Sequence, residues 1–183
     1  MGLDDSKKDI FGPYLDTKDT LGERRKRAKF YDQQSVHPKL VDEMEAKGWG
    51  FDKTLKHKVR LKRPKPVSEV LENQFWVLIH KMGFPVMNQG RHFYIEFKRA
   101  DGGYDKKQID VFAKGAEAVV VAECKTQKTL SKKSLQKEIE AFSNLKKPLA
   151  NAIRKHFGPN FNPKILWVFS TKNHSTRLNG INT

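Results

Sequence analysis

The chain has 183 residues, of which 36 are Lys or Arg and 21 are Asp or Glu, and its formal net charge is +15. That length suits one domain with an appended segment, and no apolar run reaches the ~20 residues of a membrane-spanning helix. The single cysteine, Cys124, excludes an intramolecular disulfide framework and a cysteine-based zinc site. We therefore expect a cytoplasmic protein with a polyanionic partner. Nucleic acid is the first candidate, and a membrane surface or an acidic protein are the alternatives.

The first third of the chain, residues 1–66, is expected to form a basic accessory segment. Its start has no apolar stretch, so we expect no signal peptide. A helix over 20–33 carries a basic run that could face solvent, form a localisation-like patch or contact phosphate, and we favour phosphate contact. The residues of this run that we assign to nucleic acid are Arg24, Arg25, Lys26 and Arg27.

Three shorter elements complete this segment. A helix is expected over 38–47, because it starts with a proline and Gly48 can end it. A short strand over 56–61 follows. Residues 62–66 then read as a linker, because their two prolines cannot donate hydrogen bonds to a strand ladder. The accessory segment is therefore predicted to be mainly helical.

The second part, residues 67–183, has the element pattern of an α/β domain. Apolar residues at helical spacing, followed by Gly83, predict a helix over 67–82. The order that follows is three strands, one long helix and a last strand. We expect the strands over 93–97, 108–113, 118–125 and 164–170, and the long helix over 132–156. The last two strands are continuously apolar, which is typical of strands covered on both faces.

Polar residues interrupt the apolar strand over 118–125. Alternate side chains of a strand share a face, so Glu123, Lys125 and Gln127 point to one side and Cys124 points to the other, into the core. Three polar groups on one face of such a strand are costly to bury without partners or a task. A Glu-x-Lys triplet alone also fits an exposed ion pair, so a second feature has to support a functional reading.

That second feature is a carboxylate on the preceding strand. If Gly115 and Ala116 form a two-residue hairpin turn, Asp110 faces Val121 and lies diagonally from Glu123, about 7–8 Å away. A slip of one residue would move Asp110 to the opposite face. Two carboxylates with a backbone carbonyl form an oxygen site that suits Mg²⁺, or Mn²⁺ as its substitute.

The sequence resembles the PD-(D/E)xK, or restriction-endonuclease-like, nuclease superfamily over about residues 67–172. The matching motif is Asp110, twelve intervening residues and then Glu123-Cys124-Lys125, with an isoleucine before Asp110 where the family often has proline. The resemblance implies a core of helix, three-stranded antiparallel meander, helix and strand. It also implies a Mg²⁺-dependent DNA endonuclease in which Asp110, Glu123 and the Cys124 backbone carbonyl hold the metal and Lys125 stabilises charge.

The resemblance adds residues to this site. Junction resolvases of the family carry a glutamate in a first helix that ends in Gly-Phe or Gly-Tyr. Gly83-Phe84 therefore implies Glu72 as a further metal ligand, with Glu69 as the competing choice and a solvated helix charge as the simpler explanation of either. Gln127 is implied as an auxiliary catalytic residue.

Three lysines after the motif strand are expected, from their position, to hold substrate phosphates: Lys128, Lys132 and Lys133.

Two other functions stay open at this point. A DNA-binding or assembly module could keep the fold and the charge without cleaving, and its expected sign, a broken motif, is missing here. An enzyme that cleaves branched DNA or RNA would share the same chemistry. The chain ends about a dozen residues after its last predicted strand, so we expect further domains of a longer protein. A homodimer and a restriction or defence role are open alternatives.

Overall fold

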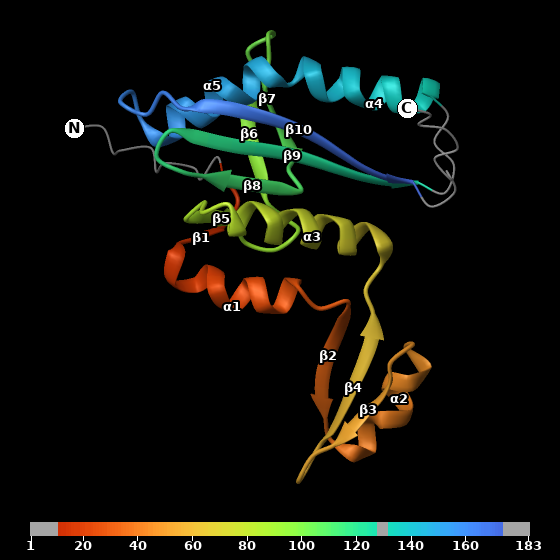
Figure 1. Ribbon diagram of the computed structural model, residues 1–183. Helices are drawn as coiled ribbons and strands as arrows, with labels where there is room; N and C mark the ends of the chain where they lie inside the picture. The colour runs from red at the N-terminus through yellow and green to blue at the C-terminus, as the bar shows by residue number, and fades with distance from the viewer. Residues whose placement is uncertain (1–10, 128–131, 174–183) are drawn as a thin grey trace, which may run out of the picture.

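The computed structural model in Figure 1 describes residues 11–127 and 132–173 of the chain. Its centre is a five-stranded sheet whose strands, in spatial order, are β1 (Tyr14–Leu15), β5 (Val86–Asn88), β8 (Val111–Lys114), β9 (Ala118–Gln127) and β10 (Lys164–Asn173). β9 and β10 run parallel, and the other neighbouring strands run antiparallel. Val119, Val120 and Val121 of β9 are all buried, because helices cover both faces of the sheet. The protein is therefore a mixed α/β structure, as predicted.

Helices form the outer layers of this domain (Figure 1). They are α1 (Thr17–Arg27), α3 (Val67–Lys81), α4 (Lys132–Asn144) and α5 (Lys146–Phe157). A further helix, α2 (Val41–Ala46), lies outside this domain (Figure 1). On one face, Trp76 and Ile79 of α3 pack against Val120. On the other face, Phe142 of α4 and Ile153 of α5 pack in a second cluster. Within the described part of the chain, no helix is long and apolar enough to cross a membrane.

The chain between β9 and β10 forms two helices instead of the single helix predicted over 132–156. Leu145 separates α4 from α5, and Pro148 lies in the first turn of α5. A proline has no N–H to donate to the carbonyl four residues earlier, but the first turn of a helix tolerates it. The helix therefore ends and restarts just before Pro148.

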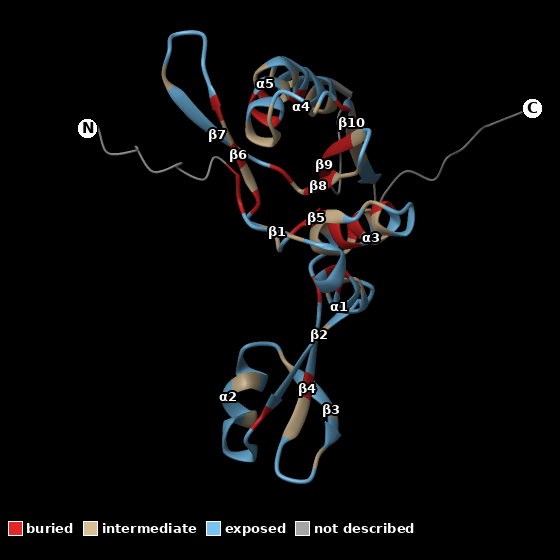
Figure 2. Ribbon diagram, turned by 90° about the vertical axis from the view of Figure 1, so that its left-hand side faces the viewer, coloured by how far each residue is buried: buried red, intermediate tan, exposed pale blue. Residues whose placement is uncertain are grey.

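The predicted three-stranded meander is divided between two sheets. β6 (Tyr94–Lys98) pairs with β7 (Tyr104–Gln108) in an antiparallel ribbon that projects from the domain (Figures 1 and 2). The chain then bends at Asp110 and continues as β8, which pairs with β5 and β9. The side chain of Asn88 bonds to the backbone directly after this bend, at the Asp110 carbonyl and the Phe112 N–H.

A separate lobe follows α1. It contains a three-stranded antiparallel sheet, β2 (Tyr31–Val36), β4 (Val59–Pro64) and β3 (Gly50–Thr54) in spatial order, with α2 and a 3-10 turn at Pro38–Leu40. The sequence predicted only part of β4, and the stretch predicted as a linker continues this strand, with Pro64 opposite Tyr31. The accessory segment is therefore not mainly helical.

The described residues that precede the lobe, 11–27, pack against the α/β domain (Figure 1). Phe11 is 4% exposed and belongs to the cluster under α5. β1 adds to the edge of the central sheet beside β5, and α1 lies along α3 (Figure 1). The lobe, in contrast, stands away from the domain, and most of its surface is exposed (Figure 2).

Candidate active site

The register between β8 and β9 determines where the predicted site forms. Val111 faces Ala122 and Lys114 faces Val119. Four residues therefore lie between Lys114 and Val119, the last paired residues of the hairpin, instead of the predicted two. The register therefore differs from the predicted one by two residues. Because a strand repeats every two residues, this shift keeps every side chain on its predicted face. Asp110, one residue before Val111, comes directly opposite Glu123 instead of diagonal to it.

Asp110 is held at the start of β8 by backbone contacts. Its Oδ2 accepts a 2.7 Å hydrogen bond from the N–H of Cys124. Burial and, to a smaller extent, the negative charges of Glu123 and Glu72 raise the pKa of Asp110 to about 6, although the Cys124 N–H and Lys125 act in the opposite direction. The carboxylates around Asp110 thus create a negative potential that favours a bound proton or a cation.

Glu123 lies between two lysine side chains. Its Oε1 is 2.9 Å from Nζ of Lys125, and its Oε2 is 2.9 Å from Nζ of Lys107. Glu123 is only 5% exposed, and its Oε2 has no partner with hydrogen-bond geometry. Burial lowers the pKa of Lys125, but the hydrogen bond and charge of Glu123 outweigh this, so the pKa is raised overall. Both lysines line a small cavity of about 80 Å³ beneath α4, together with Glu123 and Glu138.

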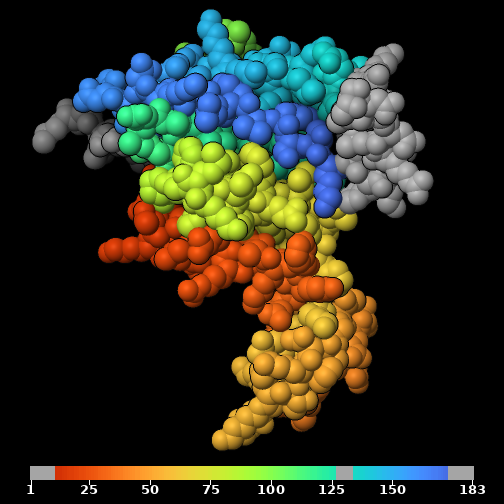
Figure 3. Space-filling model, viewed as in Figure 1, coloured from red at the N-terminus to blue at the C-terminus, as the bar shows by residue number. Residues whose placement is uncertain are grey.

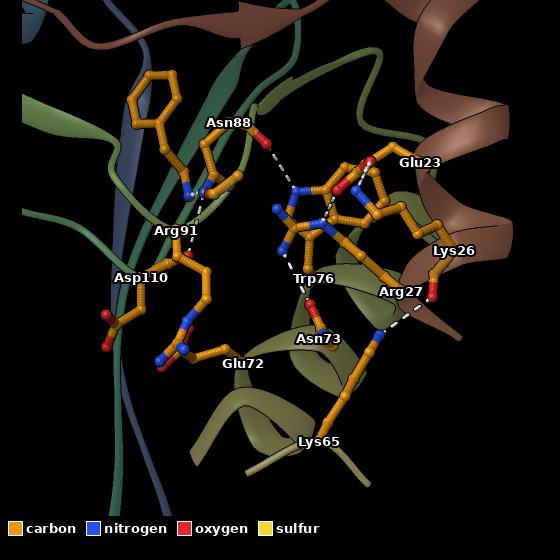
Figure 4. A network of polar contacts seen from close by, with 12 residues as sticks. Glu23, Lys26, Arg27, Lys65, Glu72, Asn73, Trp76, Asn88, Arg91 and Asp110 are labelled. Atoms are coloured by element: carbon orange, nitrogen blue, oxygen red, sulfur yellow. Dashed lines mark hydrogen bonds and ion pairs between the residues drawn. The ribbon is translucent and has the colours of Figure 1, made fainter. Parts of the chain in front are cut away.

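Glu72 lies on the α3 side of Asp110. It is 6% exposed and binds the guanidinium of Arg91 through two bonds of 2.8 Å, from Nε to Oε2 and from Nη2 to Oε1 (Figure 4). Glu69 contacts the same group more loosely, at 3.5 Å from Nη1. Glu72, unlike Glu69, is among the charges that raise the pKa of Asp110. Of the two glutamates that the sequence left open, Glu72 is therefore the one whose charge acts more strongly on Asp110.

The side chain and the backbone of Cys124 face different surroundings. The thiol is buried in the cluster with Leu71 and Trp76, as predicted, and burial raises its pKa, so it is a poor nucleophile. Its N–H points to Asp110. Because the N–H and C=O of a strand residue point to the same side, the Cys124 carbonyl is directed to the Asp110 side as well.

Several predicted residues lie at the edge of the described structure. Gln127 ends β9 opposite Asn173, and Lys132 and Lys133 begin α4, but the side chains of these residues are outside the described part. Lys128 is outside it altogether.

Arg27 is a structural residue, which corrects its assignment to nucleic acid. It is 5% exposed, and its guanidinium donates to Glu23 Oε1 at 2.8 Å and to Asn73 Oδ1 at 3.2 Å. It also lies 4.8 Å from the ring centroid of Trp76 (Figure 4). The face of α1 that carries Arg27 packs on α3, whereas Arg25 and Lys26 on the other side are exposed.

Sequence reasoning missed three residues that shape the site: Asn88, Arg91 and Lys107. Lys107 was outside the predicted strands, and Arg91 lies in a loop with no distinctive pattern. Asn88 precedes a turn that contains Gly90, but nothing in the sequence marks it as fully buried. In the structure Asn88 donates to the carbonyl of Asp110 at 3.1 Å and accepts from the N–H of Phe112 at 3.0 Å.

Asn88→Ala is expected to destabilise the protein by about 2–6 kcal/mol. The change leaves the buried Phe112 N–H and Asp110 C=O without partners, at about 1–3 kcal/mol each. Urea unfolding would measure the effect, with Asn151→Ala on the exposed side of α5 as the control, which should change little. Equal stabilities for the Asn88 variant and the wild type would show that water replaces the amide.

The arrangement offers a metal two carboxylates and one carbonyl. Across the described residues there is no group of three His, Cys, Asp or Glu side chains that could hold a metal ion together. Arg91 binds Glu72, and two lysines bind Glu123. Mg²⁺ commonly keeps several waters and needs only one or two carboxylates.

Comparisons of the chain with protein-family models, curated proteins and solved structures found no match.

Proposed function

We propose that the protein is a Mg²⁺-dependent DNA endonuclease with a restriction-endonuclease-like core. The observation that carries this proposal is the pairing of β8 with β9, which sets the Asp110 carboxylate across from Glu123 and Lys125. A restriction or defence role would follow from the family resemblance. Exposed residues of α1, including Arg25 and Lys26, would contribute to DNA binding.

The residues present fit a divalent metal. Asp110 and Glu123 would hold it with the Cys124 carbonyl, and Glu72 would join them if Arg91 released it. The raised pKa of Asp110, caused by burial and by the nearby charges of Glu123 and Glu72, supports a place where a cation would be favourable. A bound Mg²⁺ would supply positive charge to the scissile phosphate and lower the pKa of an adjacent water.

The chain's own cations would act on the substrate. Lys125 is positioned by its 2.9 Å contact with Glu123 and can donate to a phosphate oxygen as charge develops there. Lys107 comes from the projecting ribbon, and its side chain is 27% exposed. It could exchange Glu123 for a phosphate when DNA arrives. By resemblance, the products would carry 5′-phosphate and 3′-hydroxyl ends.

Cleavage of plasmid DNA tests this proposal. The wild type should nick or cut DNA with Mg²⁺ and should not do so with EDTA, whereas Asp110→Ala and Lys125→Ala should be inactive. Asp101→Ala, in the exposed turn between β6 and β7, is the matched control and should cleave normally. Linear, branched and single-stranded substrates would separate an endonuclease from a junction resolvase. Full activity of both site variants would contradict the assignment.

A DNA-binding module that does not cleave is the second candidate. It is favoured by the two lysines on Glu123, which occupy the carboxylate that the metal would need. Such a module would bind duplex DNA with a steep salt dependence. It would leave every substrate of the panel intact with Mg²⁺ and with Mn²⁺.

A further inference from the structure

A second concentration of positive charge lies between α1 and the lobe. The C-terminal half of α1 and the start of β2 line a groove of about 550 Å³ there, compared with about 80 Å³ for the cavity at Glu123. The lobe stands apart from the domain next to α1 (Figure 3). The groove residues that carry its chemistry are Arg25, Lys26, Lys29, Lys65, Tyr31 and Trp49.

The charges of this groove are poorly balanced. Its one acidic lining residue, Asp32, is 3.7 Å from the guanidinium of Arg63, whose positive charge offsets the negative charge of Asp32. Lys26 is 77% exposed and reaches Glu23 only at 4.0 Å. Lys29 donates to the neutral amide oxygen of Gln33 at 2.9 Å. The groove thus presents several ammonium groups without close carboxylates, which favours a polyanion.

Lys65 gives the groove a buried cation. The residue is 8% exposed, and its Nζ donates to the backbone carbonyl of Lys26 at 3.2 Å (Figure 4). No carboxylate of the described residues lies within ion-pair distance of it, and burial lowers its pKa. An ammonium has three donors, so donors of Lys65 remain available to an anion in the groove.

Aromatic rings accompany these cations. Tyr31 is 48% exposed in the groove wall, and the neighbouring Phe30 is 57% exposed. The guanidinium of Arg63 lies 4.8 Å from the ring centroid of Trp49. Duplex DNA offers phosphates to such a surface but keeps its bases stacked inside. Exposed rings beside a basic groove are instead what proteins use to stack unpaired bases.

We infer that this groove binds single-stranded nucleic acid, with phosphates on Arg25, Lys26, Lys29 and Lys65 and a base stacked on Tyr31. The groove is formed by α1 and the lobe, whereas the candidate active site is formed by β8, β9 and α3. Binding at the groove therefore does not depend on the proposed cleavage.

Fluorescence anisotropy with a labelled oligothymidylate in EDTA tests this inference. Tyr31→Ala should weaken binding about tenfold, since stacking contributes about 1–3 kcal/mol per base, and Tyr31→Phe should bind like the wild type. Lys26→Ala/Lys29→Ala should weaken binding and reduce the salt slope by about 1.4, because each phosphate contact contributes about 0.7. The matched control is Lys155→Ala/Lys164→Ala, which removes two exposed lysines of α5 and β10 and should bind like the wild type.

Further arms distinguish the outcomes. An oligouridylate bound as well as the oligothymidylate assigns the groove to single strands in general, and weaker binding assigns it to DNA. Duplex binding weakened by Tyr31→Ala as much as single-strand binding, single-strand binding unchanged by Tyr31→Ala, or an equal loss in the lysine control would each overturn the inference. Asp110→Ala should keep full affinity, so failure of the proposed cleavage and failure of the groove would be seen separately.

Discussion

Asp110→Asn is expected to abolish Mg²⁺-dependent cleavage, by about 10³-fold or more, and to make the metal-free protein more stable at about pH 8. Burial and nearby carboxylates raise the pKa of Asp110 from 3.8 to about 6. The folded state therefore holds the proton more tightly than the unfolded state. Ionised Asp110 lowers the free energy of unfolding, by the full amount above about pH 6 and by progressively less as the pH falls towards 3.8. Two pKa units correspond to about 3 kcal/mol as an upper limit.

Asparagine removes the charge and keeps an oxygen that can accept from the Cys124 N–H. Urea unfolding in EDTA should show a gain of about 1–3 kcal/mol for Asp110→Asn near pH 8 and a much smaller gain near pH 4. Asp101→Asn, at an exposed turn, should show no such pH dependence. Added Mg²⁺ should stabilise the wild type and not Asp110→Asn. A variant that is less stable than the wild type near pH 8 would contradict this account.

The surroundings of Asp110 show which part of the candidate site can be predicted from sequence. Alternation along β9 correctly assigned Glu123 and Lys125 to one face and Cys124 to the other. The hairpin length could not be predicted, because Gly115-Ala116 fits a two-residue turn by itself. In the structure Gly115 N–H bonds to Ala118 O at 2.8 Å, and β10 pairs with β9 from Ala118 onward. Because β10 is distant from β9 in the sequence, the local pattern could not reveal this contact. The predicted β8–β9 register was wrong by two residues, and only an even shift of this kind leaves every side chain on its predicted face of the sheet.

The accessory segment shows where sequence patterns are weakest. β2 alternates poorly, because its Tyr31–Val36 stretch is mostly polar and only Val36 is buried. The basic run of α1 looks uniformly solvated, yet Arg27 faces α3 and pairs with Asn73 and Trp76. Which residue of such a run is buried depends on the neighbour that packs on it, and no local spacing encodes that neighbour.

Arg91→Ala is expected to destabilise the metal-free protein by about 1–3 kcal/mol and to make it respond more strongly to Mg²⁺. The change leaves Glu72, which is 6% exposed, without its bidentate partner. A fully buried pair would cost about 3–5 kcal/mol to break, but the Arg91 side chain is 41% exposed, so solvent reduces the effect. Arg99→Ala removes an exposed ion pair with Asp101 and should cost less than about 1 kcal/mol.

The response to Mg²⁺ decides the role of Glu72. If the Glu72 carboxylate belongs to the metal site, Mg²⁺ replaces the lost guanidinium and raises the melting temperature of Arg91→Ala by more than that of the wild type. Arg91→Ala/Glu72→Gln should regain stability without Mg²⁺, because it carries no unpaired buried charge. An equal Mg²⁺ shift in Arg91→Ala and the wild type would instead assign Glu72 to the packing of α3. The protein ligands of the proposed metal would then be Asp110, Glu123 and the Cys124 carbonyl alone.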